Sequence, residues 1–167
     1  TVQVRESGIP VISASVTEPF AEVAVVTVTV NKGFGEYEFS LNGGEFQTSN
    51  EFYDVESGAH LITARGISGD CGQAVLEVVV LKHPKYFTPN KDGFNETWTI
   101  PILRDHPEAR ISIFDRYGKL LKLMTPTDSW DGTYNGREMP SDDYWFRVTF
   151  DLKGAPKEFK SHFTLRR

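Results

Sequence analysis

The sequence predicts an all-β protein built from two tandem antiparallel β-sandwich domains, at residues 1–82 and 83–167. Apolar and polar residues alternate with a period of two in most runs, which is typical of half-buried strands. Turns rich in Gly separate these short runs, and no convincing helical period occurs. The sequence also changes character at residues 82–86, where a second module begins.

The two halves carry different net charges. Residues 1–82 hold 4 Lys and Arg against 11 Asp and Glu, a net charge of -7, whereas residues 83–167 hold 14 against 12, a net charge of +2. This asymmetry supports a boundary near residues 82–86. Neither half has the basic stripe that nucleic-acid binding requires, so we expect no nucleic-acid partner.

Cysteine content and hydropathy narrow the class of protein. Cys71 is the single cysteine, so no internal disulfide bond can form, and we expect a small buried or half-buried thiol. No run approaches the roughly 20 apolar residues that cross a bilayer, so no transmembrane segment is expected. Thr1-Val2-Gln3-Val4 lacks the basic start and apolar core of a signal peptide. We therefore expect a soluble fragment whose export signal lies upstream or has been removed.

Strands of the first half are predicted at residues 11–17, 24–30, 37–41, 59–65 and 74–81. The run at 24–30 is strongly β-branched, which favours a strand. Asn42-Gly43-Gly44 indicates a tight hairpin turn, after which residues 45–47 would form the returning strand.

This order of pieces resembles the immunoglobulin-like repeats of large bacterial surface proteins. The matching residues are 37–47, Phe52, Val55, Ser57-Gly58, 59–65 and Gly69-Asp70-Cys71. The resemblance implies an immunoglobulin-like spacer or adhesive domain and implies no chemistry.

Two ordered loops are predicted in the second half. Residues 86–98 are aromatic at both ends and polar in the middle. Pro89 fixes one backbone angle of this stretch, and Gly93 allows backbone angles that other residues resist. Residues 130–137 contain the turn dipeptides Asp-Gly and Asn-Gly. Strands are expected at 97–100, 110–115, 119–124 and 144–152, with a helical turn or loop between 103 and 109. Alternation in 144–152 places Trp145 on the face opposite Phe146, and a last strand would turn Phe159, Phe163 and Leu165 inward.

Five blocks of the second half follow one another in a fixed order. They are Phe87-Thr88-Pro89-Asn90-Lys91-Asp92-Gly93-Phe94-Asn95-Glu96-Thr97-Trp98, Ile113-Phe114-Asp115-Arg116-Tyr117-Gly118, Trp130-Asp131-Gly132-Thr133-Tyr134-Asn135-Gly136, Tyr144-Trp145-Phe146 and Phe163-Thr164-Leu165-Arg166. Together they resemble the gliding motility-associated C-terminal domain, the type B sorting tail of the type IX secretion system of gram-negative bacteria. The resemblance covers about residues 84–167.

The sequence departs from the family pattern at three places. Lys91 stands where the family usually has Gly, Ser161 where Gly is frequent, and Ser141-Asp142-Asp143 replaces a common small-residue turn. These departures concern loop conformation and leave the apolar anchors in place.

The resemblance implies a non-catalytic sorting signal that directs a cargo protein through the outer membrane by the type IX secretion system. The cargo would cross the inner membrane by an N-terminal signal and reach the cell surface or the medium through the periplasm. The implied partners are the outer-membrane translocon and a dedicated outer-membrane β-barrel protein. No cofactor is implied.

We expect the recognised surface in the two ordered loops and the terminal strand, whose exposed edge would accept a strand from a partner. The residues assigned to this surface are Asn90, Asp92, Gly93, Asn95, Arg116, Tyr117, Gly118, Trp130, Asp131, Gly132, Phe163, Leu165 and Arg166.

The alternative function is a glycan- or calcium-binding module of a bacterial surface adhesin. Asn90, Asp92 and Asn95 have the oxygen-donor spacing of a calcium loop but lack the bidentate Glu of an EF-hand, so we expect an Asx-type turn there. Large aromatic residues mostly anchor the core of small β domains. Those available for sugar stacking are Trp98, Trp130, Tyr134 and Trp145.

Catalysis within the chain is not expected. The four histidines lie on separate elements without the spacing of a metal site. Asp115 with Asp131, and Ser129 or Ser161 with His162, lack a catalytic motif and an orienting third group. Any enzymatic activity of the cargo would therefore lie upstream.

Overall fold

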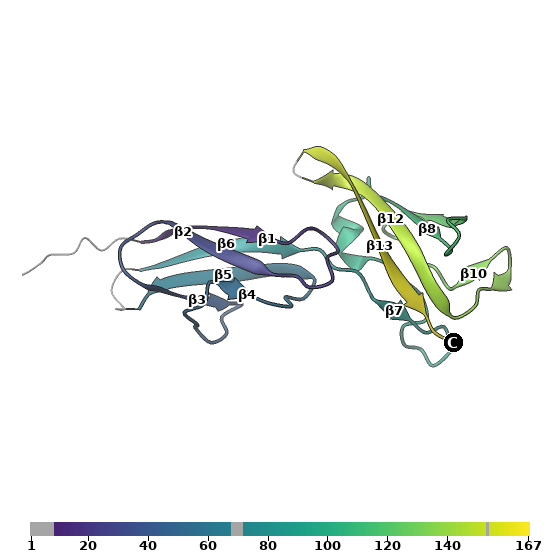
Figure 1. Cartoon of the computed structure of the whole chain (residues 1–167), viewed down its shortest axis with the longest axis horizontal. Coiled ribbons are helices and arrows are strands. Elements are labelled where there is room, and N and C mark those ends of the chain that lie inside the picture. Colours follow the sequence, from purple (N-terminus) through teal and green to yellow (C-terminus); the bar gives the residue numbers. More distant parts are fainter. Residues whose placement is uncertain (1–8, 68–71, 153) are drawn as a thin grey trace, which may run out of the picture. The chain divides into compact units, whose positions relative to one another are not determined.

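The computed structural model describes residues 9–67, 72–152 and 154–167. The chain divides into two compact units, Thr1–Leu81 and Lys82–Arg167 (Figure 1). The described elements are strands and one short 3-10 helix, so the predicted all-β class is confirmed. The thiol expected at Cys71 lies outside the described residues.

The N-terminal unit contains two three-stranded antiparallel sheets, with strand orders β1-β2-β4 and β3-β5-β6. Val26 and Val28 of the first sheet share one buried cluster with Phe39, Ile62 and Val80 of the second, so the two sheets enclose a common core. The strands are β1 (Val11–Val16), β2 (Val26–Lys32), β3 (Tyr37–Leu41), β4 (Glu51–Phe52), β5 (Gly58–Gly66) and β6 (Gln73–Val80).

The predicted return strand at residues 45–47 is wrong. A turn does follow β3, with positive φ at Asn42 and Gly43, but residue Gln47 alone bridges back to Phe39. The partner of β3 along its length is β5, and the Asn42 amide N–H donates to the Leu61 carbonyl at 2.7 Å. The chain then crosses to the other sheet, where β4 pairs with β2.

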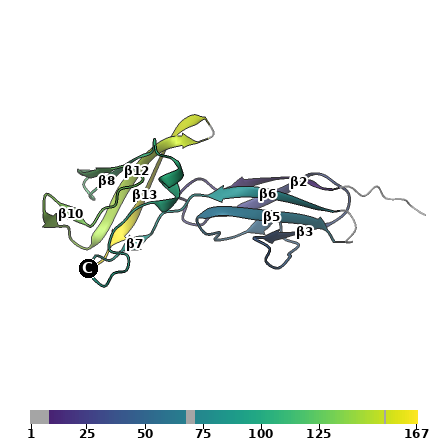
Figure 2. The ribbon, with the colours of Figure 1, turned by 180° about the vertical axis from the view of Figure 1, so that it is seen from behind.

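The C-terminal unit is organised around a five-stranded sheet of order β7-β13-β12-β8-β9. Its neighbouring strands are antiparallel except for β7 and β13, which are parallel. Figure 2 shows β12 and β13 side by side as one long hairpin. The strands are β7 (Tyr86–Phe87), β8 (Arg110–Phe114), β9 (Leu120–Met124), β12 (Asp142–Leu152) and β13 (Ala155–Leu165), with the small hairpin β10 (Thr133–Tyr134) and β11 (Arg137–Glu138) and the 3-10 helix η1 (Pro101–Asp105).

The strand predicted at residues 97–100 is also wrong, because only Trp98 is paired, in a single antiparallel bridge to Trp130. Two backbone hydrogen bonds of 2.8 and 2.9 Å form this bridge. Pro101 then begins η1, since proline lacks the N–H that would continue a ladder. The bridge joins the two ordered loops to each other.

One face of the five-stranded sheet is buried by these loops. Trp98 lies on Phe163 of β13 with ring centroids 3.9 Å apart and an interplanar angle of 13°. Trp130 meets Phe163 and Tyr144 edge to face. Both indole N–H groups are satisfied, because Trp98 Nε1 donates to the Pro84 carbonyl at 2.9 Å and Trp130 Nε1 to the Thr133 carbonyl at 2.8 Å.

Truncating Phe163 should therefore destabilise the C-terminal unit. We expect Phe163→Ala to lower the free energy of unfolding by about 3–5 kcal/mol, because a buried aromatic ring and its stacking partner lose their contacts. Urea denaturation of the full chain, followed by tryptophan fluorescence, measures this change. Tyr117→Ala is the matched control, since the Tyr117 side chain is 86% exposed; equal stability of the two variants would contradict the central role of the Phe163 ring.

Candidate functional site

Most residues of the predicted sorting surface lie at two places on the C-terminal unit. One is the end of the unit where residues 88–98, residues 130–141 and the end of β13 meet, and the other is the β8–β9 turn at Arg116, Tyr117 and Gly118. Asn90, Asp92, Gly93, Asn95, Asp131 and Arg166 are exposed at the first place.

Four of the predicted surface residues are buried, so their assignment to a contact surface is wrong. Trp130, Phe163 and Leu165 have no exposed side-chain surface, and Gly132 is buried beside them. Side chains alternate across a strand, so Phe163 and Leu165 face the core while Arg166 faces solvent. These four residues support the surface from beneath.

The first loop, residues 88–98, is held by its own polar side chains. Asn90 Oδ1 accepts the Asp92 N–H at 3.1 Å, and Asp92 Oδ1 accepts the Phe94 N–H at 2.8 Å, which is the expected Asx-type geometry. Glu96 closes the loop by accepting the Gly93 N–H at 3.0 Å. Lys91, which stands where the family usually has Gly, has a φ of 67°, a left-handed conformation that glycine adopts without strain.

The side-chain oxygens of Asn90 and Asp92, two of the three residues considered as calcium ligands, are thus engaged in the turn. The N–H of Phe94, followed by the Asn90 amide, holds the pKa of the Asp92 carboxyl below its ordinary value. Within residues 9–67, 72–152 and 154–167, no three His, Cys, Asp or Glu side chains converge as metal ligands. Trp98 and Trp130 are fully buried and cannot stack on a sugar, so these two residues are the core anchors that the sequence favoured over a sugar-stacking platform.

The second loop, residues 130–141, contains a similar turn. Asp131 Oδ1 accepts both the hydroxyl of Thr133 at 2.8 Å and its N–H at 2.9 Å. Partial burial opposes ionisation of Asp131, but these hydrogen bonds outweigh it, so the pKa of the carboxyl lies below its ordinary value. Asn135 and Gly136 then turn the β10–β11 hairpin with φ values of 51° and 73°.

Arg167 joins the two loops, a role that sequence reasoning missed. Its guanidinium donates to the carbonyls of Met139 and Gly132 at 3.1 Å and reaches the carbonyl of Pro89 at 3.5 Å. Glu138 pairs with the same group at 3.4 Å, and the Arg167 side chain is only 22% exposed. The alternation of apolar residues offers no signal for this role, because the partners are backbone carbonyls.

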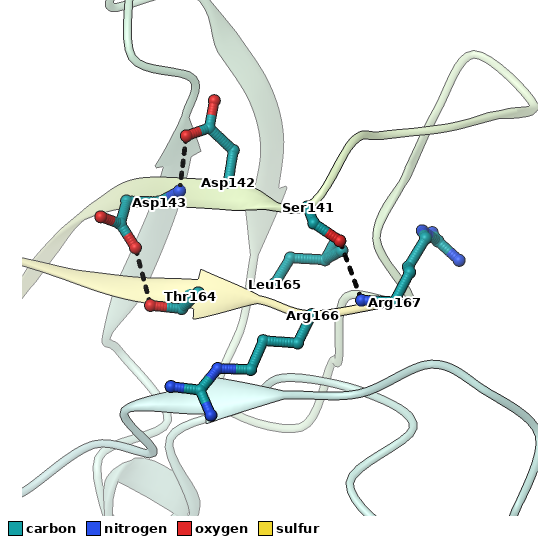
Figure 3. A pocket seen from close by; sticks show the side chains of 7 residues that line it. All are labelled: Ser141, Asp142, Asp143, Thr164, Leu165, Arg166 and Arg167. Carbon is teal, nitrogen blue, oxygen red and sulfur yellow. Dashed lines mark hydrogen bonds between the residues drawn. The ribbon is translucent and has the colours of Figure 1, made fainter.

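A shallow hollow of about 350 Å³ opens beside Arg167 (Figure 3). Asp143 accepts the Thr164 hydroxyl across its wall at 2.7 Å, and the Arg167 N–H donates to Ser141 Oγ at 2.9 Å. Figure 3 shows Arg166 extending toward β7, where its guanidinium lies 4.7 Å from the centroid of the Tyr86 ring. The hollow is therefore braced by polar contacts between chain segments.

The last residues of β13 do not form the free edge that the sequence suggested. Strand β7 pairs with Thr164 and Leu165, and the Arg166 N–H donates to the Phe87 carbonyl at 3.0 Å. A partner strand therefore cannot add at these positions. No described strand pairs with the same edge of β13 from Ala155 to Phe163, so strand addition along that stretch stays a prediction.

The β8–β9 turn is the second of the two places at which residues of the predicted sorting surface lie. Asp115 Oδ1 accepts the N–H groups of Tyr117 and Lys119, both at 2.9 Å, and Gly118 has a φ of 80°. Arg116 forms an ion pair with Asp142, which raises the pKa of the guanidinium. This turn holds Arg116 at the rim of a groove on the outward face of the sheet.

Residues 81–165, just over half of the chain, match the CHU_C type IX secretion signal domain family. The chain belongs to this family. The sorting-domain resemblance seen in the sequence is thereby confirmed, and membership indicates export through the periplasm to the cell surface or medium. CHU_C domains are secretion signals rather than a known enzyme family.

No curated protein sequence matches this chain, and two solved structures resemble it only weakly. The BSP domain of a biofilm-associated protein has a TM-score of 0.28 at 13% identity, with 92% of this chain and 29% of that one covered. A two-domain fibronectin type III segment of chicken tenascin has a TM-score of 0.28 at 12% identity, with 93% of this chain and 98% of that one covered. Both scores are too low to inform function.

In the part of the chain that the structure describes, no helix is long and apolar enough to span a membrane.

Gly132 provides a test of how tightly the loops close on β13. A Cβ at Gly132 would lie 2.6 Å from Leu165 Cδ1, whereas one at Gly136 meets nothing within 4 Å, and both residues have a left-handed φ. We expect Gly132→Ala to lower the free energy of unfolding of the full chain by about 2–5 kcal/mol and Gly136→Ala by about 1–2 kcal/mol. Equal losses in urea denaturation would show that the loop relaxes freely away from Leu165.

The first loop should also loosen at acidic pH. The pKa of the Asp92 carboxyl is lowered in the folded loop, so its stabilising effect is complete above its ordinary pKa and is lost as the pH falls through the lowered one. We expect the Phe94 amide resonance to titrate in that acidic window by NMR and its hydrogen exchange to accelerate relative to residues outside the loop. Asp92→Asn should abolish this titration; an unchanged titration in that variant would assign it to another group.

Proposed function

We propose that this chain is the sorting end of a larger exported protein, with residues 82–167 as the signal and residues 1–81 as an immunoglobulin-like spacer. The observation that carries the proposal is the match of residues 81–165 to the CHU_C family, which coincides with the compact unit Lys82–Arg167. The cargo lies upstream of the spacer. The signal itself performs no chemistry and acts by being recognised.

The rigid end of the C-terminal unit supports this role. A signal shared by different cargoes must present the same surface each time, and here two loops are fastened by the Trp98–Trp130 bridge and by Arg167. We assign the recognised surface to the exposed members of the predicted set. They are Asn90, Asp92, Gly93, Asn95, Asp131 and Arg166, together with Arg116, Tyr117 and Gly118.

The partners that we infer are the type IX outer-membrane translocon and a dedicated outer-membrane β-barrel protein. A glycan- or calcium-binding adhesin module has weaker support. The indoles of Trp98 and Trp130 are buried, and the side-chain oxygens of Asn90 and Asp92 hold the loop.

A reporter fusion tests the proposal. A periplasm-directed fluorescent protein followed by residues 1–167 should reach the surface or medium of a host with a type IX secretion system. The same fusion should remain in the periplasm of a translocon-deficient strain, which controls for leakage. Retention of the fusion in the periplasm of the competent host would reject the sorting function.

A further inference from the structure

The outward face of the five-stranded sheet carries an apolar row that the core does not use. Cross-strand register forms this row from His162 of β13, Trp145 of β12, Phe114 of β8 and Leu120 of β9, each of which lies opposite the next on the neighbouring strand. Trp145 is 49% exposed, although it occupies an interior strand. Alternation along β12 explains its direction, because Tyr144 and Phe146 on either side of it are buried in the core.

A basic row runs beside the apolar one. The register places Lys160, Arg147, Ser112 and Leu123 next to one another across the same four strands. Leu123 is 67% exposed, so it extends the apolar surface toward the edge strand. The face therefore combines aromatic and aliphatic side chains with long cations.

These rows border a groove of about 450 Å³, which we name the tryptophan groove. Its surface is mainly apolar, and its lining includes Phe114, Asp115, Arg116, Trp145, Arg147 and Lys160. The single acidic group among these six is Asp115, and its Oδ1 already accepts two backbone N–H groups. The lining therefore has an excess of positive charge.

Two carboxylates outside this lining face its cations: Asp142 pairs with Arg116, while Arg147 and Lys160 share Glu158. Glu158 lies 3.8 Å from Arg147 Nη1 and 3.0 Å from Lys160 Nζ, so one carboxylate serves two cations. All three side chains are substantially exposed, and such pairs contribute little to stability in water. Arg147 and Lys160, which have one carboxylate between them, thus remain available to a carboxylate that arrives from outside.

We propose that the tryptophan groove receives an apolar protein segment that carries carboxylates, presented by the outer-membrane export machinery. This proposal rests on the sorting function proposed above and adds a second contact surface to the loop end. Trp and Arg are the residues most enriched at the centres of protein interfaces, where they carry much of the binding energy. A mainly apolar lining fits protein side chains better than a sugar, which needs many polar partners, and Arg147 and Lys160, which share one carboxylate, fit acidic residues.

Export of the reporter fusion with substituted full-length tails tests the groove. We expect Trp145→Ala, and separately Arg147→Glu with Lys160→Glu, to reduce the exported fraction about tenfold or more, as loss of an interface hot spot does. Tyr53→Ala is the matched control, because Tyr53 is an aromatic residue of the N-terminal unit with 66% exposure. The thermal unfolding midpoints of all variants are measured in parallel, and we expect them to stay close to that of the unsubstituted chain.

Photocrosslinking then identifies the class of the partner. The photoreactive substitution Trp145→p-benzoylphenylalanine should give an ultraviolet-dependent adduct with an outer-membrane protein in the competent host, and the same substitution at Tyr53 should not. An adduct that is sensitive to periodate and resistant to protease would overturn the proposal in favour of a polysaccharide. So would binding of purified chain to polygalacturonate that Trp145→Ala abolishes, without a protein adduct.

The outcomes separate the groove from the sorting function. If the unsubstituted fusion is exported and both groove variants are exported equally well, the groove proposal is overturned while the sorting function stands. If the unsubstituted fusion stays in the periplasm, both proposals fall together. A fall in export that follows a lowered unfolding midpoint in both groove variants also overturns it, since stability then accounts for the loss.

Discussion

The stacking of Trp98 on Phe163 is the contact on which the C-terminal unit depends. It fastens a loop with only one bridged residue onto the central pair of strands, and its rings are 3.9 Å apart and fully buried. Aromatic burial of this kind supplies more stabilisation than the few backbone hydrogen bonds of the loop could. The first loop is thereby fastened to the sheet although residues 88–98 form no strand.

This fastening extends to the surface through polar contacts of a different kind. Arg167 satisfies carbonyls of both loops, and Gly132 permits an approach to Leu165 that a side chain would prevent. Backbone carbonyls in irregular segments need partners when water is partly excluded, and a single guanidinium provides several donors. The end of the unit is therefore one braced surface, which is the property that a reusable sorting signal needs.

Strand β12 divides its residues between two tasks. Tyr144, Phe146 and Val148 build the core, while Trp145 and Arg147 face solvent on the opposite side of the same strand. The pleat keeps the two sets apart, so residues on the outward face can change with little effect on packing. The large aromatic side chain of Trp145 on that face is consequently better explained by a partner, as proposed above, than by the stability of the fold.

The sequence by itself determined the strands with clear alternation, the Asx turn at Asn90 and Asp92, and the family of the second half of the chain. These features are local, because period, turn chemistry and ordered motifs act over a few residues. Only the tertiary structure decided that Trp130 of the second loop is buried, and that Thr97 to Ile100 form no strand. Long-range contacts settle these points: the bridge between Trp98 and Trp130 and the packing of both rings on Phe163 join segments far apart in the sequence, and the carbonyl partners of Arg167 leave no pattern along the chain.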